Sequence, residues 1–266
     1  MNSKSFSCLG VIPVRLESSR LPQKPLKDIH GQTLVERVWR QAKKCSQLHT
    51  VVVATNSPEI AEVCKTFSAQ VVMTGSQHET GTDRVAEALT IIEKDHGSFD
   101  FVANIQGDMP FINPAVIDSV IQDLASVSDS FDMATIATPI TDRNEFERTA
   151  AVKIALGENE RALYFSRSPI PHWRNFPGED AITPETPYGV KHMGLYIYKN
   201  ETLKRLSKLP RAMTEQREAL EQLRALAHGI AIKVNVLPRP MVEPAIEVDT
   251  PEDLEKAIQY ARSTGT

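Results

Sequence analysis

The first half of the chain alternates short, nearly continuous apolar runs with longer segments whose apolar residues recur every three or four positions. The short runs predict strands buried on both faces, and the longer segments predict amphipathic helices. Strands that alternate with helices in this way indicate βαβ units and a parallel sheet. We expect strands at 8–14, 50–55, 70–74 and 101–105, and helices that begin after Thr33, at Ser57-Pro58, after Gly81-Thr82 and at Asn113-Pro114.

The second half of the chain is less regular. Its pattern predicts strands at 133–139, 151–155, 191–199 and 230–237, an exposed excursion over 169–187, and helices over 214–227 and from Thr250-Pro251. No internal repeat or linker interrupts the chain. We therefore expect an α/β fold with a mostly parallel sheet flanked by helices, formed by a single domain over 1–266 with an inserted arm or sub-lobe around 140–190.

Composition and charge exclude several classes of function. The 34 acidic and 30 basic residues give a net charge of −4, which argues against a general nucleic-acid binder or a membrane-surface protein. No apolar stretch is long enough for a signal peptide or a membrane span, so we expect a cytoplasmic protein without membrane insertion. The three cysteines are far apart and show no metal-binding spacing, and Cys8 and Cys64 lie in apolar stretches that predict burial.

Polar clusters follow the predicted strands that end near Val14, Thr74 and Ile105, where parallel sheets carry their working residues. The first cluster places the cations Arg15, Arg20 and Lys24 on one loop. Converging Arg and Lys side chains suit a phosphorylated ligand, although a solvated basic loop is the alternative. The chain has no Walker A or GxGxxG pattern, so it is neither a P-loop nor a dinucleotide-binding protein.

Two carboxylates are candidate magnesium ligands. Asp108 ends the turn after the strand at 101–105, and magnesium commonly takes one or two protein carboxylates together with water and phosphate oxygens. A simple Gly-Asp turn explains this residue equally well. Asp249 precedes Thr250, whose capping role and acidic first turn account for Glu252 and Asp253 but leave Asp249 unexplained.

The strand at 191–199 carries a candidate binding surface. Alternation places His192, Gly194 and Tyr196 on one face, which suits contact with a sugar; a partly buried histidine satisfied by hydrogen bonds is the alternative. The other histidines show no zinc-binding spacing, and no nucleophile signature is present.

Together, these stretches resemble the 3-deoxy-manno-octulosonate cytidylyltransferases. The resemblance spans almost the whole chain, and its motifs occur in the family's order. They are IPVRLESSRLPQKPL at 12–26, HETGTDRVAEA at 78–88, NIQGD at 104–108, ALYFSRSPIP at 162–171, KHMGLYIY at 191–198, LEQLRAL at 220–226 and VDTPEDLEK at 248–256.

The resemblance implies a nucleotide-diphospho-sugar-transferase-like, Rossmann-like fold with a smaller dimerisation arm, in an enzyme that is usually a homodimer. It implies transfer of CMP from CTP to the acid sugar 3-deoxy-manno-octulosonate (Kdo), with release of pyrophosphate, for bacterial lipopolysaccharide or capsule synthesis. The resemblance implies catalytic roles for Arg15, Arg20, Lys24 and Asp108, and Mg²⁺ binding by Asp108 and Asp249. It implies nucleotide binding by Arg15, Arg20, Lys24, Thr82, Arg84 and Gln106, and acid-sugar contacts by Arg167, His192, Tyr196, Glu221 and Gln222.

Two positions depart from the family pattern. Met109 stands where the family has glutamate, and Gln23 stands where it usually has glycine. Two alternatives therefore stay open. The acceptor could be a related acid sugar, such as an amino-substituted octulosonate or a sialic-acid-like molecule, or the chain could be a non-catalytic paralogue that binds nucleotide.

Overall fold

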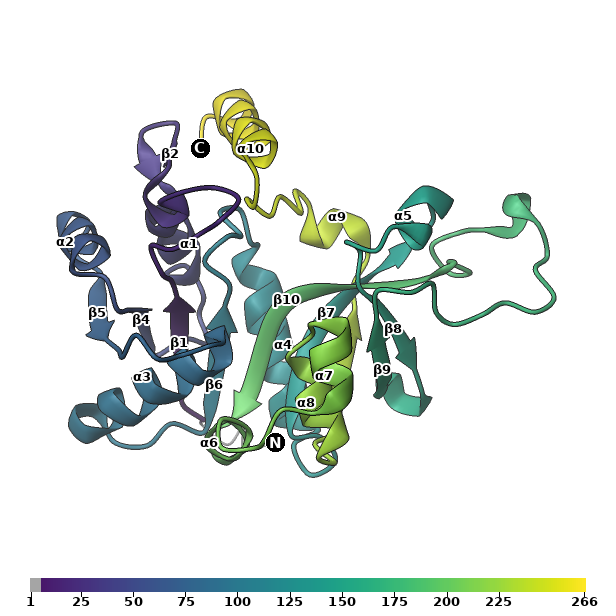
Figure 1. Ribbon diagram of the computed structural model, residues 1–266, viewed down its shortest axis with the longest axis horizontal. Helices are drawn as coiled ribbons and strands as arrows, with labels where there is room; N and C mark the ends of the chain where they lie inside the picture. Colours follow the sequence, from purple (N-terminus) through teal and green to yellow (C-terminus); the bar gives the residue numbers. More distant parts are fainter. Residues whose placement is uncertain (1–5) are drawn as a thin grey trace. The chain divides into compact units, whose positions relative to one another are not determined.

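The computed structural model describes residues 6–266, and the polar run at 1–5 lies outside the described residues. The chain divides into two compact units, which are described separately (Figure 1). Unit 1 comprises Met1–Ile121 and Glu243–Thr266, and unit 2 comprises Gln122–Val242. The segment at 140–190, expected to form an arm or sub-lobe on a single domain, belongs to unit 2, and that domain assignment stays a prediction.

Unit 1 contains a parallel sheet in the order β6-β1-β4-β5. All of its strands match predicted segments, and β1, β4 and β6 are formed largely of buried residues, as their apolar runs indicate. The edge strand β5 is more exposed. The parallel sheet confirms the predicted α/β class. The strands are β1 (Cys8–Pro13), β4 (Thr50–Thr55), β5 (Gln70–Met73) and β6 (Phe101–Ile105).

Most helices of unit 1 begin at a side-chain cap. Thr33, Ser57 and Thr250 accept backbone N–H bonds at the predicted starts of their helices. The helix expected after Thr82 begins earlier, because Thr80 Oγ1 accepts the Asp83 amide. The helical elements are η1 (Lys24–Leu26), α1 (Leu34–Ala42), α2 (Pro58–Thr66), α3 (Gly81–His96), α4 (Pro114–Ser126), whose last turns belong to unit 2, and α10 (Pro251–Thr264). A short hairpin of β2 (Asp28–Ile29) and β3 (Gln32–Thr33) lies beside α10.

The strand order of unit 1 creates a switch point at β1. The chain extends the sheet from β1 through β4 to β5, then crosses back through α3 to place β6 on the opposite side of β1. The loops that leave the carboxyl ends of β1 and β6 are therefore neighbours, which is where open α/β sheets bind ligands. Gly107 permits this approach, because a Cβ atom there would lie 2.5 Å from Val14 Cγ1.

Unit 2 contains a second group of strands, mostly antiparallel. Strand β7 pairs parallel with β11 and antiparallel with β10, which in turn pairs antiparallel with β8. The strand β9 was not predicted; it forms a hairpin with β8 through η2 (Glu158–Glu160). The strands are β7 (Met133–Ile140), β8 (Lys153–Leu156), β9 (Ala162–Ser166), β10 (Gly189–Lys199) and β11 (Ile232–Val236).

The single helix predicted over 214–227 is wrong. The chain forms α7 (Met213–Glu218) and α8 (Gln222–Ala227), separated at Ala219, whose φ of 52° is left-handed. The Arg167 guanidinium donates hydrogen bonds to the carbonyl oxygens of Glu218 and Ala219. In a continuous helix these oxygens would instead accept bonds from the amides four residues ahead. The remaining helical elements of unit 2 are α5 (Arg143–Glu147), η3 (Glu179–Ala181), α6 (Asn200–Leu206) and α9 (Arg239–Val242).

The segment at 169–187 contains only the short η3 as regular structure and is mostly exposed, as its composition predicts. In Figure 1 it forms the long loop that precedes β10. The predicted burial of Cys8 and Cys64 is confirmed, and Cys45 is buried as well. Burial raises the pKa of the Cys64 thiol to about 12, so this thiol is protonated near neutral pH. Within residues 6–266, no helix combines the length and apolar character needed to span a bilayer.

Candidate functional site

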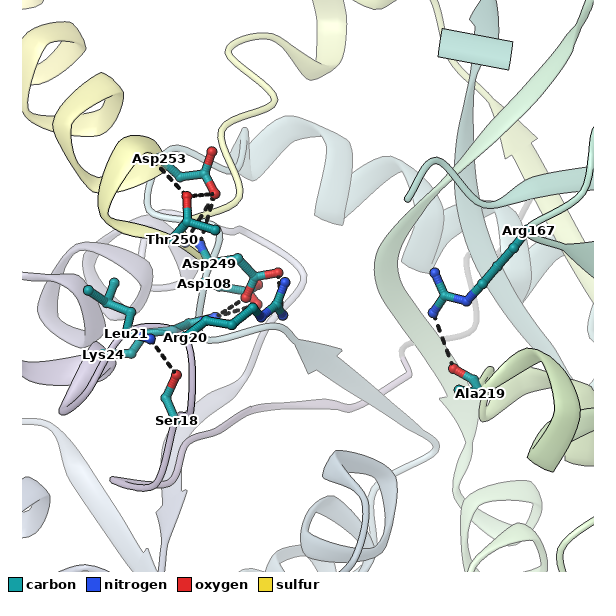
Figure 2. A network of polar contacts seen from close by, with 10 residues as sticks. All are labelled: Ser18, Arg20, Leu21, Lys24, Asp108, Arg167, Ala219, Asp249, Thr250 and Asp253. Atoms are coloured by element: carbon teal, nitrogen blue, oxygen red, sulfur yellow. Dashed lines mark hydrogen bonds and ion pairs between the residues drawn. The ribbon is translucent and has the colours of Figure 1, made fainter. Parts of the chain in front are cut away.

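Four charged side chains from distant parts of the sequence meet in unit 1 (Figure 2). Lys24 Nζ lies 2.9 Å from Asp108 Oδ2 and 2.8 Å from Asp249 Oδ1. Arg20 Nη2 lies 3.0 Å from Asp249 Oδ2. We call Arg20, Lys24, Asp108 and Asp249 the charged cluster. Three of the polar segments singled out in the sequence thus converge, beside the switch point of the sheet.

The backbone around the charged cluster is fixed by specific contacts. Lys24 begins η1, with the buried Pro25 next in the chain, and it follows Gln23, whose φ of 55° is left-handed. Glycine adopts this conformation without steric cost, which agrees with the glycine that the resemblance implies at this position. The Val248 amide donates to the Asp108 carbonyl over 2.9 Å, which brings the segment that carries Asp249 beside Asp108.

The charges within the cluster balance. Burial alone would lower the pKa of Lys24, but Asp108 and Asp249 outweigh it and raise the pKa above its ordinary value. The ammonium group is therefore protonated at neutral pH. Its side chain is only 16% exposed, whereas that of Arg20 is 65% exposed. Lys24 is thus the less solvent-screened partner of the two carboxylates.

The donor set of Asp108 and Asp249 fits a magnesium ion. Their oxygens already converge on one cation, the Lys24 ammonium, from two separate segments. Magnesium keeps several water or phosphate ligands and needs few protein carboxylates. Among residues 6–266, no group of three or more His, Cys, Asp or Glu side chains could hold a metal. A cation at this pair would therefore complete its coordination with ligand or water oxygens.

The other predicted nucleotide contacts also lie in unit 1. Arg15 is exposed on the loop after β1, and Thr82 is buried in the first turn of α3. Arg84 is buried and donates to Thr74 Oγ1 and the Gly75 carbonyl, while burial and the nearby Arg15 lower the pKa of its guanidinium. Gln106 Nε2 donates to Asn104 Oδ1 over 3.2 Å.

The loop between β5 and α3 is anchored by a pair that sequence reasoning missed. The Glu87 carboxylate accepts the Gly75 amide over 2.8 Å and bonds the His78 ring. Burial would raise the pKa of Glu87, but the bonds from His78 and Gly75 outweigh it and hold the pKa below its ordinary value. No spacing rule signals a contact between residues nine positions apart across a loop and a helix.

The rings of His192 and Tyr196 lie side by side in unit 2, closer together than the regular alternation assumed for their strand would place them. The ladder between β10 and β7 is irregular between Met193 and Tyr196. Their rings lie 5.3 Å apart, whereas positions four apart on a regular strand would be separated by roughly 13 Å. Thr135 Oγ1 stabilises the irregularity by bonding the Leu195 carbonyl over 2.8 Å and His192 Nε2 over 3.0 Å.

Both rings are neutral. Burial lowers the pKa of His192 to about 3 and raises that of Tyr196 well above its ordinary value. Neither side chain therefore carries a charge near neutral pH. The bond to Thr135 also agrees with the simpler interpretation of His192 as a histidine satisfied within the fold.

Arg167 is held by the protein itself. Its Nε donates to the Glu218 carbonyl over 2.7 Å, and its Nη2 reaches the Ala219 carbonyl over 3.5 Å (Figure 2). The Glu218 carboxylate in turn accepts Ser166 Oγ over 2.6 Å and the Arg167 amide over 2.9 Å. We call this arrangement the Glu218 clamp. It joins the end of β9 to the turn between α7 and α8 and was not foreseen from the sequence.

The two remaining predicted residues follow the Glu218 clamp directly. Glu221 is exposed, whereas Gln222 is 5% exposed in the first turn of α8. The Gln222 Nε2 group is buried and has no hydrogen-bond partner among the described residues. A buried amide donor without a partner costs roughly 1–3 kcal/mol, so this group favours a ligand that accepts its hydrogen bond.

Comparison with known proteins assigns the chain to a family. A family model described as cytidylyltransferase matches residues 9–232. Two relatives named 3-deoxy-manno-octulosonate cytidylyltransferase come from Polynucleobacter necessarius and Bacteroides thetaiotaomicron. The first is 43% identical over 98% of this chain and 99% of its own length. The second is 42% identical over 96% of this chain and 98% of its own length.

Solved structures agree with this assignment. A CMP:2-keto-3-deoxy-manno-octonic acid synthetase, solved in complex with CTP, has a TM-score of 0.85 and 35% identity, with 97% of this chain and 99% of that chain covered. A cytidylyltransferase from Leptospira borgpetersenii has a TM-score of 0.59 at 15% identity, with coverages of 98% and 96%, and shows likeness of fold alone. The expected nucleotide-diphospho-sugar-transferase-like fold is confirmed. The chain belongs to the 3-deoxy-manno-octulosonate cytidylyltransferase family.

Proposed function

We propose that this protein transfers CMP from CTP to 3-deoxy-manno-octulosonate and releases pyrophosphate, in the synthesis of bacterial lipopolysaccharide or capsule. The observation that carries the proposal is the charged cluster, which joins two cations and two carboxylates from distant segments at the switch point of a parallel sheet. Relatives that bear this name over almost their full length support the acceptor.

The proposed step is a displacement at phosphorus. The anomeric 2-hydroxyl oxygen of the acid sugar bonds to the α-phosphorus of CTP, and the bond from that phosphorus to the bridging oxygen breaks. The electron pair of the broken bond stays on pyrophosphate, and the hydroxyl proton passes to solvent. Such transfers depend mainly on positioning and charge neutralisation. Arg15, Arg20 and Lys24 would bind the phosphates and neutralise charge on the departing pyrophosphate.

Asp108 and Asp249 are the proposed ligands of Mg²⁺. When bound, this ion would offset negative charge on the phosphates. The two carboxylates hold a cation between them already, in the form of the Lys24 ammonium. The first turn of α10 holds the backbone at Asp249, because the Asp253 carboxylate accepts the Asp249 amide over 3.4 Å and the Thr250 amide over 3.1 Å.

The remaining predicted residues divide between the two substrates. Thr82, Arg84 and Gln106 are the proposed contacts to the nucleotide. His192, Tyr196, Glu221 and Gln222 are the proposed contacts to the acid sugar, together with Arg167. The unpartnered Nε2 donor of Gln222 suits a carboxylate or hydroxyl oxygen of the sugar. Arg167 has a second role, because its guanidinium holds the turn that precedes Glu221 and Gln222.

Pyrophosphate release tests the proposal. The enzyme is supplied with each common nucleoside triphosphate, Mg²⁺ and 3-deoxy-manno-octulosonate, and each component is then omitted in turn. We expect release only when CTP, the acid sugar and the metal are present together. Release with an amino-substituted octulosonate or a sialic acid in place of 3-deoxy-manno-octulosonate would reassign the acceptor. Binding of CTP without release from any acid sugar would indicate a non-catalytic paralogue.

The proposal extends to the assembly and the cellular location of the protein. We propose a homodimer, as the resemblance implies, and a location in the cytoplasm. The three buried cysteines are all unpaired, which suits a reducing compartment. Light scattering coupled to size-exclusion chromatography measures the mass in solution, and a monomeric mass at micromolar concentration would contradict the homodimer.

A further inference from the structure

The charged cluster holds its own cation. The Lys24 ammonium contacts both proposed metal ligands, at 2.9 Å from Asp108 and 2.8 Å from Asp249. With Arg20 on the second carboxylate, two positive charges face two negative charges. The formal charges of these four side chains therefore sum to zero.

We propose that Lys24 competes with the metal for Asp108 and Asp249, and that the nucleotide relieves this competition by drawing the Lys24 ammonium to its phosphates. The inference rests on the proposed function for the identity of the metal ligands. It goes further in assigning Lys24 two alternative partners, and in making metal and nucleotide binding mutually dependent.

Electrostatics favours this exchange of partners. A divalent cation added alone to a balanced cluster leaves excess positive charge in a partly buried site, which opposes binding. A triphosphate brings more negative charge than one divalent cation neutralises, so it supplies a new partner for Lys24 and frees the carboxylates. The Lys24 side chain is mostly buried, whereas the exposed Arg20 side chain is screened by solvent. The charge of Lys24 therefore has the larger effect on cation binding by the two carboxylates.

The local structure allows the Lys24 side chain to move without the backbone. Residue 24 is fixed in η1 by the neighbouring Pro25 and by Lys27, whose amide bonds the Lys24 carbonyl over 3.2 Å. The flexible four-carbon stem of lysine still allows its ammonium to move between partners. Arginine would not replace it readily, because a planar guanidinium places its donors differently.

Manganese binding in the absence of nucleotide tests the proposal. Free Mn²⁺ is measured by electron paramagnetic resonance with the wild type, Lys24→Met and Lys24→Gln, at one pH and ionic strength. We expect both variants to bind Mn²⁺ about tenfold more tightly than the wild type. Lys27→Met is the matched control, because Lys27 lies on the same segment and has no ion pair among the described residues; it should bind like the wild type.

Two further measurements locate the effect. Adding Asp249→Asn to Lys24→Met should remove the gain in Mn²⁺ affinity. Adding CTP should raise Mn²⁺ affinity more in the wild type than in Lys24→Met, since binding coupling is reciprocal. Circular dichroism melting curves check that each variant is folded. If Lys24→Met does not fold, Lys24→Gln provides the same test.

Equal Mn²⁺ affinity of the wild type and the folded Lys24 variants without nucleotide would overturn the inference. This outcome is distinct from failure of the proposed function, because the binding experiment involves no turnover. A wild type that releases no pyrophosphate, but whose Lys24 variants bind Mn²⁺ more tightly, would refute the reaction and support the exchange of partners.

Discussion

Gly107 allows the loops that follow β1 and β6 to pack closely against each other. It joins β6 to Asp108 and lies against the end of β1, where a Cβ atom would come within 2.5 Å of Val14 Cγ1 and 3.2 Å of the Pro13 carbonyl oxygen. Val14 is buried, so its side chain has little room to move. The glycine therefore fixes the spacing between the two loops that carry the cluster.

We predict that Gly107→Ala lowers the free energy of unfolding by about 1–3 kcal/mol, because the added methyl group overpacks this contact. Urea denaturation measures the change. Gly81→Ala is the matched control. A Cβ atom at this helical position would meet Pro13 Cγ at 3.7 Å, an ordinary contact, so we expect little loss of stability. Equal stability of Gly107→Ala and the wild type would show that the loops are not closely packed.

His192 makes stability depend on pH. Its folded pKa of about 3 lies below its unfolded value of about 6.5, so between these values the unfolded state binds more protons. Stability then rises with pH, by at most about 1.4 kcal/mol per pH unit, and is lost as the pH falls from 6.5 toward 3.

We therefore predict that His192→Gln flattens the dependence of unfolding free energy on pH between about 4 and 6.5. The measurement is a series of urea denaturation curves at constant ionic strength. The other histidines are common to both proteins, so their contribution cancels in the comparison. Parallel pH profiles for variant and wild type would mean that His192 is not buried as described.

At the scale of elements, sequence patterns predicted what local interactions determine. The parallel strands of unit 1 coincide with the apolar runs, and Thr33, Ser57 and Thr250 cap their helices through contacts within a few residues. The break at Ala219 depends instead on Arg167, which is distant in sequence, and could not be read from helical periodicity. The same holds for the irregularity in β10, which Thr135 stabilises from another strand.

The Glu218 clamp allows a functional test of the break between α7 and α8. Its carboxylate accepts bonds from Ser166 Oγ and the Arg167 amide, and so positions the turn before Glu221 and Gln222. We predict that Glu218→Gln raises KM for the acid sugar by about tenfold with kcat and KM for CTP nearly unchanged, because its amide group cannot accept both bonds. Steady-state kinetics with each substrate varied provides the measurement.

Glu147→Gln is the control for the Glu218 clamp, because Glu147 is exposed and pairs only with the exposed Arg143 among the ion pairs of the described residues. It should leave all kinetic constants as in the wild type. If Glu218→Gln lowered the melting temperature but left KM for the acid sugar unchanged, Glu218 would have a purely structural role.

At the scale of the whole molecule, the proposed chemistry is distributed over two units. The parallel sheet of unit 1 carries the charged cluster, and the mostly antiparallel strands of unit 2 carry His192 and Tyr196. The partners of Lys24 are 84 and 225 positions away in the sequence. The approach of Lys24 to Asp108 was predictable, since the loops that carry them leave parallel strands at one edge of the sheet. Asp249 follows no strand of this sheet, and the contact of Lys24 with both carboxylates was not predicted.

The departures from the family pattern are also explained at this scale. Met109 is buried in unit 1, where it packs as part of the core rather than adding a carboxylate to the charged cluster. Gln23 adopts the left-handed backbone that glycine would adopt, so the loop keeps its shape despite the larger side chain. Neither residue removes a member of the charged cluster, which favours an active enzyme over a silent paralogue.

The central claim is that the charged cluster of unit 1 carries nucleotidyl transfer, and pyrophosphate release by Asp108→Asn tests it most directly. The variant is compared with the wild type and with Asp95→Asn, which changes an exposed aspartate of α3 in the same unit. We predict that Asp108→Asn lowers kcat by about 10²–10³-fold with an unchanged melting temperature, while Asp95→Asn retains full activity. A folded Asp108→Asn enzyme with near wild-type turnover would contradict the account.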